Sequence, residues 1–281
     1  MPTFDTREPI TAVLALVMGD VRISAGERAT TSVAVTPSDG ANEDDVKAAQ
    51  LTVVEYGDGR LLVKAPKLGS LLSRGGPGSV DVAVELPAGS DVVGAAASAD
   101  FHGDGRLGDC RIKLGLGAVR LDEVGKLSVK CGAGDVSVHH VSRHAEVTAG
   151  SGDIRVERAG DSAALKASNG DTWVGVAGGD LRVRAANGSI AVGSAHASVV
   201  AKSANGDIRL GDVGGGSVEV ETHAGDLEVG IREGTAAWLD LNASAGRVHN
   251  DLDAAERPED SEQTVEVRAR TSIGDVVIRR A

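Results

Sequence analysis

The chain has few aromatic residues. Its 281 residues include two Trp, one Tyr and two Phe, namely Phe4, Tyr56, Phe101, Trp173 and Trp238. Single-stranded nucleic acid stacks its bases on aromatic rings, and phosphates are contacted by Lys and Arg. With a formal net charge of −12, the chain is expected to have no nucleic-acid partner. Val, Leu, Ile and Ala must fill the core, which favours thin, regular layers.

Cysteine is also scarce. Only Cys110 and Cys131 are present, and two cysteines do not make a disulfide framework. The repeat described below places them at different points along a coil side, too far apart to bridge. We expect both to be small core residues.

No segment is long and apolar enough to cross a membrane. The chain begins MPTFDTREPI, without a basic leader, and the apolar run from Ala12 to Met18 is too short to span a bilayer. That run reads as a strand instead. The sequence predicts a cytoplasmic protein without an integral membrane segment.

A Gly-Asp turn recurs at a fixed interval. Glycines followed by an apolar, variable, apolar pattern are evenly spaced from Gly134 to Gly206, and such periods mark repeat architectures. The step into this run is one residue shorter, and the steps after it lengthen progressively. The glycines that carry the pattern are Gly117, Gly134, Gly152, Gly170, Gly188, Gly206, Gly225, Gly246 and Gly274.

Each repeat carries two strand signals. Apolar residues alternate after the glycine, as in Ile154 and Val156, and again seven and five residues before it, as in Leu181 and Val183. Two short strands in each step describe one coil of a β-solenoid, in which each coil buries its apolar residues against its neighbours. We predict an all-β fold, a single-stranded β-helix over residues 91–281 with about 18 residues per coil. The coils are expected to follow one another in chain order.

Residues 1–90 are rich in strand signals but lie outside this register. Gly19-Asp20-Val21-Arg22-Ile23 echoes the repeat, residues 42–50 fit one or two helical turns, and residues 68–78 read as a loop. Because an open coil exposes unpaired backbone groups, we interpret residues 1–90 as an N-terminal cap continuous with the solenoid. Near the other end, residues 250–263 form a polar insertion that is expected to shield a strand edge.

The chain resembles a family of bacterial β-strand repeat proteins of uncharacterised function, often labelled "putative adhesin". The resemblance is carried by the segment from Val80 to Ser90, VDVAVELPAGS, and by the repeated Gly-Asp units that follow. It covers most of the chain. It implies a β-repeat architecture and a structural or protein-binding role, and it brings no catalytic residues.

The turn residues read as folding devices. Glycine permits a positive φ, and a side chain of Asp next to it bonds backbone amides, while Asn residues stacked at the repeat interval form an amide ladder. A calcium-binding role for the Asp column, as in a calcium-stabilised surface adhesin, is the alternative. The residues concerned are Gly134, Asp135, Gly152, Asp153, Gly170, Asp171, Gly206, Asp207, Asn169, Asn187 and Asn205.

A basic column lies four residues before the glycines. It consists of Lys113, Lys130, Lys166, Arg184 and Lys202, and Thr148 interrupts it. One interpretation is that it offsets the neighbouring Asp column through weak surface attraction. The other is that it binds a partner, together with an outward-facing Trp173 that could anchor a protein or a sugar.

Enzyme signatures are absent from the sequence. There is no G-x-S-x-G elbow and no phosphate-binding loop, and the seven histidines fall in different columns, so neither a metal nor a cofactor is expected. We predict a non-enzymatic scaffold that binds another protein or a second copy of itself. A β-helix that binds or processes polysaccharide is the runner-up.

Overall fold

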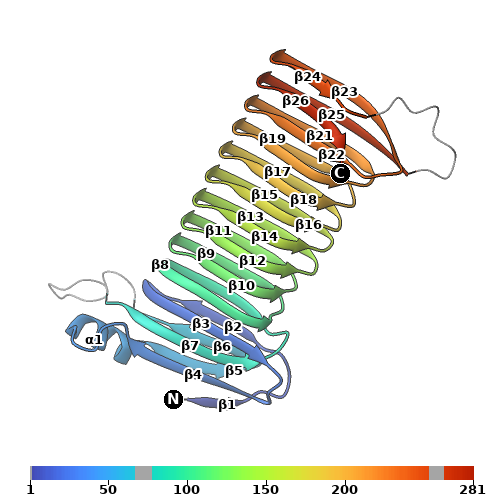
Figure 1. Cartoon of the computed structure of the whole chain (residues 1–281). Coiled ribbons are helices and arrows are strands. Elements are labelled where there is room, and N and C mark those ends of the chain that lie inside the picture. The colour runs from blue at the N-terminus through green and yellow to red at the C-terminus, as the bar shows by residue number, and fades with distance from the viewer. Residues whose placement is uncertain (1, 67–77, 253–262) are drawn as a thin grey trace. The chain divides into compact units, whose positions relative to one another are not determined.

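The computed structural model describes residues 2–66, 78–252 and 263–281 and is built almost entirely of parallel β-strands (Figure 1). This confirms the predicted all-β solenoid. The chain divides into two compact units, Met1–His140 and Val141–Ala281. The predicted division at residue 90 stays a prediction, while the division into units falls after His140.

Unit 1 is made of two ladders of strands. One ladder runs β5-β6-β2-β8-β9-β11, and the other runs β1-β4-β7-β3-β8-β10-β12, because the long strand β8 contributes to both. The strands are β1 (Thr3–Asp5), β2 (Thr11–Ala15), β3 (Met18–Gly26), β4 (Thr30–Pro37), β5 (Val53–Gly57), β6 (Arg60–Lys64), β7 (Val80–Pro87), β8 (Asp91–Arg106), β9 (Cys110–Leu116), β10 (Val119–Val124), β11 (Leu127–Ala133) and β12 (Val136–Val141).

The first coil of the chain is inserted between two later ones. Strand β2 pairs in parallel with β6 on one side and β8 on the other, and β3 pairs likewise with β7 and β8. The echo of the repeat at Gly19-Asp20 is therefore a true coil turn, with Gly19 at φ 133°. Beyond this point the antiparallel strands β5, β4 and β1 end the ladders.

Helix α1 (Glu43–Leu51) confirms the helical turns predicted from residues 42–50. Asn42 is its N-cap, and the side-chain oxygen accepts hydrogen bonds from the amides of Asp44 and Asp45. Three acidic residues in the first turn also suit the positive end of the helix dipole. The buried Asp45 carboxylate accepts from the Ser79 amide, which ties α1 to the start of β7.

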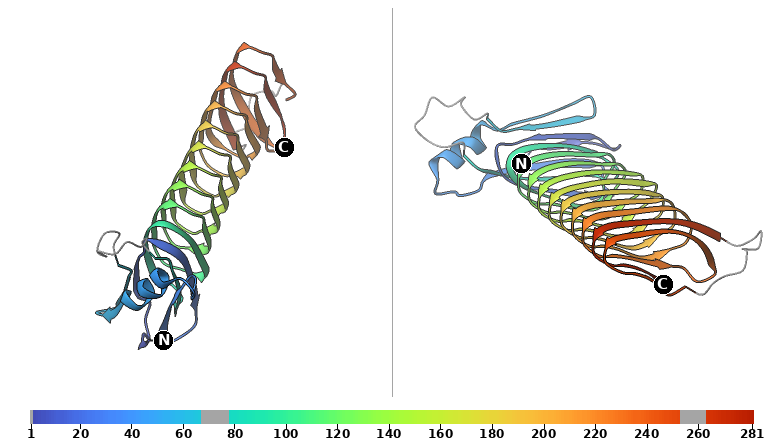
Figure 2. Two further views of the ribbon diagram at one scale, coloured as in Figure 1. Left: turned by 90° about the vertical axis from the view of Figure 1, so that its left-hand side faces the viewer. Right: turned by 90° about the horizontal axis from the view of Figure 1, so that it is seen from above.

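Unit 2 stacks coils in the same way (Figure 2). Its odd-numbered strands form one parallel ladder and its even-numbered strands form the other. The strands are β13 (His144–Ser151), β14 (Ile154–Ala159), β15 (Ser162–Asn169), β16 (Thr172–Ala177), β17 (Asp180–Asn187), β18 (Ile190–Ala195), β19 (Val199–Asn205), β20 (Ile208–Val213), β21 (Gly216–Ala224), β22 (Leu227–Ile231), β23 (Thr235–Ala245), β24 (Val248–Asn250), β25 (Gln263–Ile273) and β26 (Val276–Arg280).

The last coils of unit 2 do not follow chain order. Strand β25 pairs with β21 on one side and β23 on the other, and β26 lies in the same way between β22 and β24 (Figure 1). The expectation that the coils follow one another in chain order is therefore wrong for these last coils. A parallel coil makes the same backbone hydrogen bonds with either neighbour, so spacing along the chain does not decide which coil is last.

The core consists of small aliphatic side chains. Both ladders turn Val, Leu, Ile and Ala inward, and Val183, Ile190 and Val229 have no exposed surface. Phe101 is the one aromatic side chain among the largest buried residues of the described ranges. Layers about 10 Å apart leave room for aliphatic but few aromatic side chains, which is why so few aromatics suffice.

Both cysteines are free and buried, which confirms the sequence prediction. Cys110 faces Leu127 and Cys131 faces Leu114 in the paired strands β9 and β11, so the two cysteines lie at different positions along the strands. Burial, with a smaller contribution from Asp91 and Asp109, raises the pKa of the Cys110 thiol to about 12.

Two predictions fall partly on residues that lie outside the described ones. These are the loop at 68–78 and the polar insertion at 250–263, of which 68–77 and 253–262 are not described. Within the described ranges, no helix is long and apolar enough to span a bilayer.

Candidate functional site

The glycine column of unit 2 stacks backbone on backbone. Gly152, Gly170, Gly188 and Gly206 have φ values of 124° to 143°, a region that favours glycine. A Cβ placed on Gly188 would lie 2.1 Å from the carbonyl oxygen of Gly170, and one on Gly206 would lie 2.2 Å from that of Gly188. These positions therefore need glycine for conformation and for space.

The Asp column links each coil to the next. The Asp153 Oδ1 accepts from the amide of Asp171 at 2.8 Å, and the Asp171 Oδ1 accepts from the amide of Ser189 at 2.8 Å. Further along, Asp226 accepts from Asp275, and Asp275 accepts from the amide of Arg247, which follows the inserted coil order. Asp135 also has a bonding partner.

The Asn ladder is present in the three paired strands. The Asn187 side-chain amide donates to the Asn169 oxygen at 2.9 Å, and Asn205 donates to Asn187 at 2.9 Å. The side chains of these turn residues thus form hydrogen bonds between neighbouring coils.

We expect the Asp column to stabilise the fold without a bound cation. Replacing Asp171 with Ala should reduce the free energy of unfolding by about 1 kcal/mol, because a charged acceptor of a backbone amide is lost. Asp171→Asn should retain most of the stability, since its oxygen still accepts. Urea unfolding followed by circular dichroism measures both.

The matched control is Ser189→Ala, which removes a side chain of the same column and should have almost no effect on stability. Adding calcium should leave the unfolding curve of the wild-type chain unchanged. A calcium-dependent rise in stability that a chelator reverses, and that Asp171→Ala abolishes, would instead support the calcium-binding alternative. Among the described residues, no three His, Cys, Asp or Glu side chains gather where they could hold a metal ion.

The basic column divides between the two units. In unit 1, Lys113 and Lys130 face each other on β9 and β11. In unit 2, Lys166, Arg184 and Lys202 face one another on β15, β17 and β19. Thr148 occupies the same row on β13, where the sequence predicted the interruption.

The outer face of unit 2 changes in character along this row. Lys202 donates hydrogen bonds to Glu219 at 2.6 Å and to Glu221 at 2.9 Å. The hydrogen bond from Lys202 lowers the pKa of the Glu219 carboxyl, and the two carboxylates raise the pKa of the Lys202 ammonium. In the coils beyond, Arg270 pairs with Asp240 at 3.1 Å.

The other end of the row carries unpaired positive charge. Lys166 and Arg184 lie side by side with Arg182 on the outer face, and all three side chains are exposed. None of the three has a side-chain hydrogen bond or ion pair among the described residues. We call Lys166, Arg182 and Arg184 the basic cluster. Arg182 was not predicted, although its position two residues before Arg184, on the same face of a strand, was a usable signal.

One interpretation of the basic column was that it offsets the Asp column. Among the described residues, no ion pair joins the two columns. Lys202 is bound to Glu219 and Glu221, and Asp207 lies 3.9 Å from Arg209 instead. The turn carboxylates use an oxygen on backbone amides, which explains why the basic side chains find other partners or none.

Trp173 lies apart from the basic cluster. It belongs to β16, in the even-numbered ladder, and it is half-buried. The guanidinium of Arg155 stacks over its ring, 3.9 Å from the centroid, a favourable cation–π contact. The predicted outward-facing Trp173 is half-buried, because Arg155, its neighbour on β14, covers its ring. The more exposed of the two tryptophans is Trp238, at 58%.

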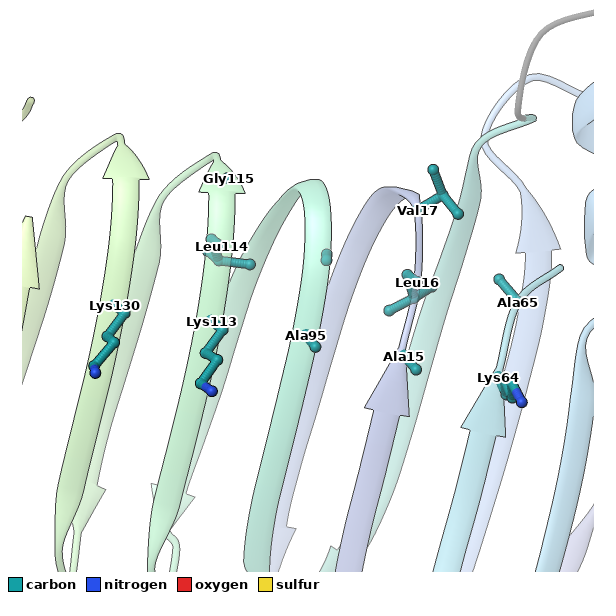
Figure 3. A pocket seen from close by; sticks show the side chains of 11 residues that line it. Ala15, Leu16, Val17, Lys64, Ala65, Ala95, Lys113, Leu114, Gly115 and Lys130 are labelled. Carbon is teal, nitrogen blue, oxygen red and sulfur yellow. The ribbon is translucent and has the colours of Figure 1, made fainter. Parts of the chain in front are cut away.

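A hollow in unit 1 was not predicted. It has a volume of about 480 Å³ and opens on the outer face of β6, β2, β8 and β9 (Figure 3). Five residues occupy the same register position on these strands and on β11, namely Lys64, Ala15, Ala95, Lys113 and Lys130. Two coils thus carry Ala where their neighbours carry Lys.

Comparison with known proteins gives a family but no activity. The sequence profile of one family, described as Toastrack DUF4097, matches residues 13–279, and no curated protein matches the chain. Three solved structures are similar over their whole length. A "putative cell adhesion protein" from Clostridium sporogenes is 12% identical, covering 100% of this chain and 98% of that one, with a TM-score of 0.23.

Two further structures have the same sequence identity and somewhat higher TM-scores. A "putative adhesin" from Bacteroides fragilis is 12% identical, covering 99% of this chain and 95% of that one, with a TM-score of 0.37. A "putative lipid binding protein" from Parabacteroides distasonis is 12% identical, covering 100% and 95%, with a TM-score of 0.32. At these TM-scores the likeness carries no argument about function.

Proposed function

The chain belongs to the Toastrack DUF4097 family, and we propose that it is a non-enzymatic scaffold that binds an acidic protein surface through the basic cluster of unit 2. The observation that carries the proposal is that Lys166 and Arg184 occupy facing positions on paired strands beside Arg182, with no carboxylate paired to any of the three among the described residues. Like charges that face each other across strands destabilise a sheet. Folding alone would favour the arrangement seen two coils away, where Lys202, Glu221 and Arg270 alternate in sign.

The geometry supports a protein partner. Parallel pairing holds Lys166 and Arg184 about 4.8 Å apart on a fixed face, with Arg182 beside them, so a complementary group of carboxylates gains several contacts at once. Electrostatic complementarity of this kind raises association rates and selects partners. The few aromatic rings and the net charge of −12 disfavour nucleic acid as the anionic partner.

Hydrolysis of polysaccharide is the less favoured alternative. The hollow of about 350 Å³ near the end of unit 2 is lined by Glu221 and Asp240, the residue types that glycosidases use. Lys202 binds Glu221 and Arg270 binds Asp240, so each carboxylate is paired with a cation, whereas a glycosidase needs one of its two carboxyl groups as a proton donor. The lack of enzyme activity and the cytoplasmic location stay predictions, which a glycan-hydrolysis screen and cell fractionation test.

We expect Arg184→Glu to stabilise the chain and to abolish partner binding. The new carboxylate would stand between Lys166 and Lys202, turning two repulsive contacts into attractive ones and raising the free energy of unfolding by about 0.5 kcal/mol. Urea unfolding measures the gain. Affinity capture from extracts of the source cell, with wild type and variant compared side by side, measures the loss of the partner.

The matched control is Arg209→Glu, an exposed cation on the even-numbered ladder, which should capture the same partner as wild type. Loss of stability in Arg184→Glu would show that the cluster serves the fold. Retention of every captured protein by Arg184→Glu would remove the cluster as the binding surface. Capture of nucleic acid, shown by nuclease sensitivity, would overturn the assignment of a protein partner.

A further inference from the structure

We propose that the hollow of unit 1 binds a single-chain anionic amphiphile, a molecule with one acyl or alkyl chain and a carboxylate, sulfate or phosphate head. This inference is independent of the scaffold function, because it concerns other residues in the other unit. It rests on the shape of the hollow, the chemistry of its floor and the charge of its walls.

The hollow arises from the inserted first coil. At one position of the outer face the strands β6, β2, β8, β9 and β11 carry Lys64, Ala15, Ala95, Lys113 and Lys130. The two short Ala side chains between the long Lys side chains leave a trough. Lys64 and Lys113 form its two walls, and their strands are three strand spacings, about 14 Å, apart. Figure 3 shows Lys113 and Lys130 extending parallel to each other on the two strands that follow that of Ala95.

The floor of the trough is apolar. Apart from the three lysines, the lining residues are Ala, Leu, Val and Gly, namely Ala15, Leu16, Val17, Ala65, Ala95, Ala96, Leu114 and Gly115. The floor continues along the outer face into half-buried Val13, Leu62 and Val93, which face one another on β2, β6 and β8. An apolar strip of this kind on an outer face marks a binding surface.

The floor selects an acyl chain over a sugar or a peptide. A sugar needs side-chain hydrogen-bond partners, and the lining offers only the lysine ammonium groups. A peptide strand needs a free strand edge, but β2 is paired on both sides, with β6 and β8. Hydrocarbon needs neither, since removing it from water is favourable in proportion to the area covered.

The walls select an anionic head. Lys64, Lys113 and Lys130 are exposed and have no side-chain hydrogen bond or ion pair among the described residues, and no carboxylate of those residues lines the hollow. On a chain with a net charge of −12, this is a local excess of positive charge. Lysine binds anions as a point charge with little demand on geometry, so carboxylate, sulfate and phosphate heads all fit.

A concave trough fits one detached chain better than a bilayer. Insertion into a membrane requires apolar side chains that project, whereas the apolar residues here line a hollow that also has three lysines. The chain's own residues 67–77, which follow β6, are a poor match in charge, because Lys67 and Arg74 are their charged residues. The external amphiphile is therefore the occupant we assign.

The test is calorimetric titration of the full chain with decanoate below its micellar concentration. We expect one binding site, with acetate and the uncharged decyl maltoside binding at least about tenfold more weakly, because each lacks one of the two groups recognised. Lys113→Gln/Lys130→Gln removes the head contact and should weaken decanoate binding about tenfold or more. Ala95→Gln, which fills the trough without adding charge, should do the same.

Lys126→Gln is the matched control, an exposed lysine of unit 1 that does not line the hollow, and should bind decanoate like wild type. Because Ala95 is exposed, the variant is expected to fold, and its unfolding curve checks this; Ala15→Gln is the second variant if it does not. Absence of decanoate binding, or binding that Ala95→Gln and Ala15→Gln leave unchanged, would overturn the proposal. Binding to vesicles of anionic phospholipid but not to decanoate would replace it with a membrane surface.

Discussion

Replacing Gly206 with Ala is expected to lower the free energy of unfolding by about 3 kcal/mol or more, because two physical effects add. Ala must adopt the φ of 143° that Gly206 has, and such strain costs on the order of 1–3 kcal/mol. In addition, the new Cβ would lie 2.2 Å from the carbonyl oxygen of Gly188 and 2.5 Å from its carbon, an overlap that costs about as much again.

The overlap cannot be relieved by a small local shift. The Gly206 amide donates to the Ala224 carbonyl at 2.9 Å, and the Gly188 amide donates to the Asn205 carbonyl at 2.9 Å. Moving either coil away lengthens these hydrogen bonds and separates the Asn ladder between Asn187 and Asn205. We therefore expect the loss of stability to spread to the coils on both sides, as in other stacked repeats.

Urea unfolding of Gly206→Ala and of a matched glycine variant measures the effect. Gly215→Ala is the control, since the nearest atom to its added Cβ is 3.8 Å away and its φ is not positive. It should change the free energy of unfolding by no more than about 0.5 kcal/mol. Equal and small effects of the two substitutions would show that the glycine column is not closely stacked.

The repeat in the sequence predicts the coils well because one repeat step corresponds to one coil of the structure. Each step supplies a glycine for the corner, as at Gly188, and alternating aliphatic residues for two strands, as at Ile190 and Val192. The local pattern is the same whatever the neighbouring coil is. For this reason the strands, the buried cysteines and the turn glycines could all be predicted from single repeats.

The order of the coils at both ends could not be predicted in this way. The coil of β2 and β3 lies between β6/β7 and β8, and the coil of β25 and β26 lies between β21/β22 and β23/β24. In a parallel stack any coil can pair with any other through the same hydrogen bonds, so order is a tertiary property. The longer steps from Gly225 to Gly246 and on to Gly274 signal irregularity without revealing the insertion.

Of the two candidate sites, one could be predicted from the repeat and the other depends on coil order. The basic column is visible from spacing, because Lys166, Arg184 and Lys202 recur at the repeat interval. The hollow is not, since Ala15 and Ala95 are distant in the sequence and become neighbours only through the inserted first coil. The pairing of Lys202 with Glu219 was also missed, although the repeat places Glu219 and Glu221 on the next strand, six and four positions before Gly225. Spacing gives the register of strands but not the partners that long side chains choose.

Coil order at the end of unit 2 determines which charged residues share the outer face. Strand pairing sets Glu221 directly beside Arg270, with Asn242 one strand further on. Stacking in chain order would instead set Glu221 directly beside Asn242, since each stands four positions before the glycine of its own coil, Gly225 or Gly246. The alternation of charge that makes the basic cluster exceptional depends on this order.

Oxidative cross-linking of two cysteine pairs tests that order most directly. Glu221→Cys/Arg270→Cys should form a disulfide almost completely under mild oxidation of the folded chain, because facing residues on paired strands lie within bridging distance. Glu221→Cys/Asn242→Cys should form almost none, since two strand spacings, about 10 Å, exceed the reach of a disulfide. Peptide mass spectrometry identifies each bridge separately from the buried Cys110 and Cys131, and the reverse result, with the 221–242 pair bridged and the 221–270 pair free, would contradict the inserted coil.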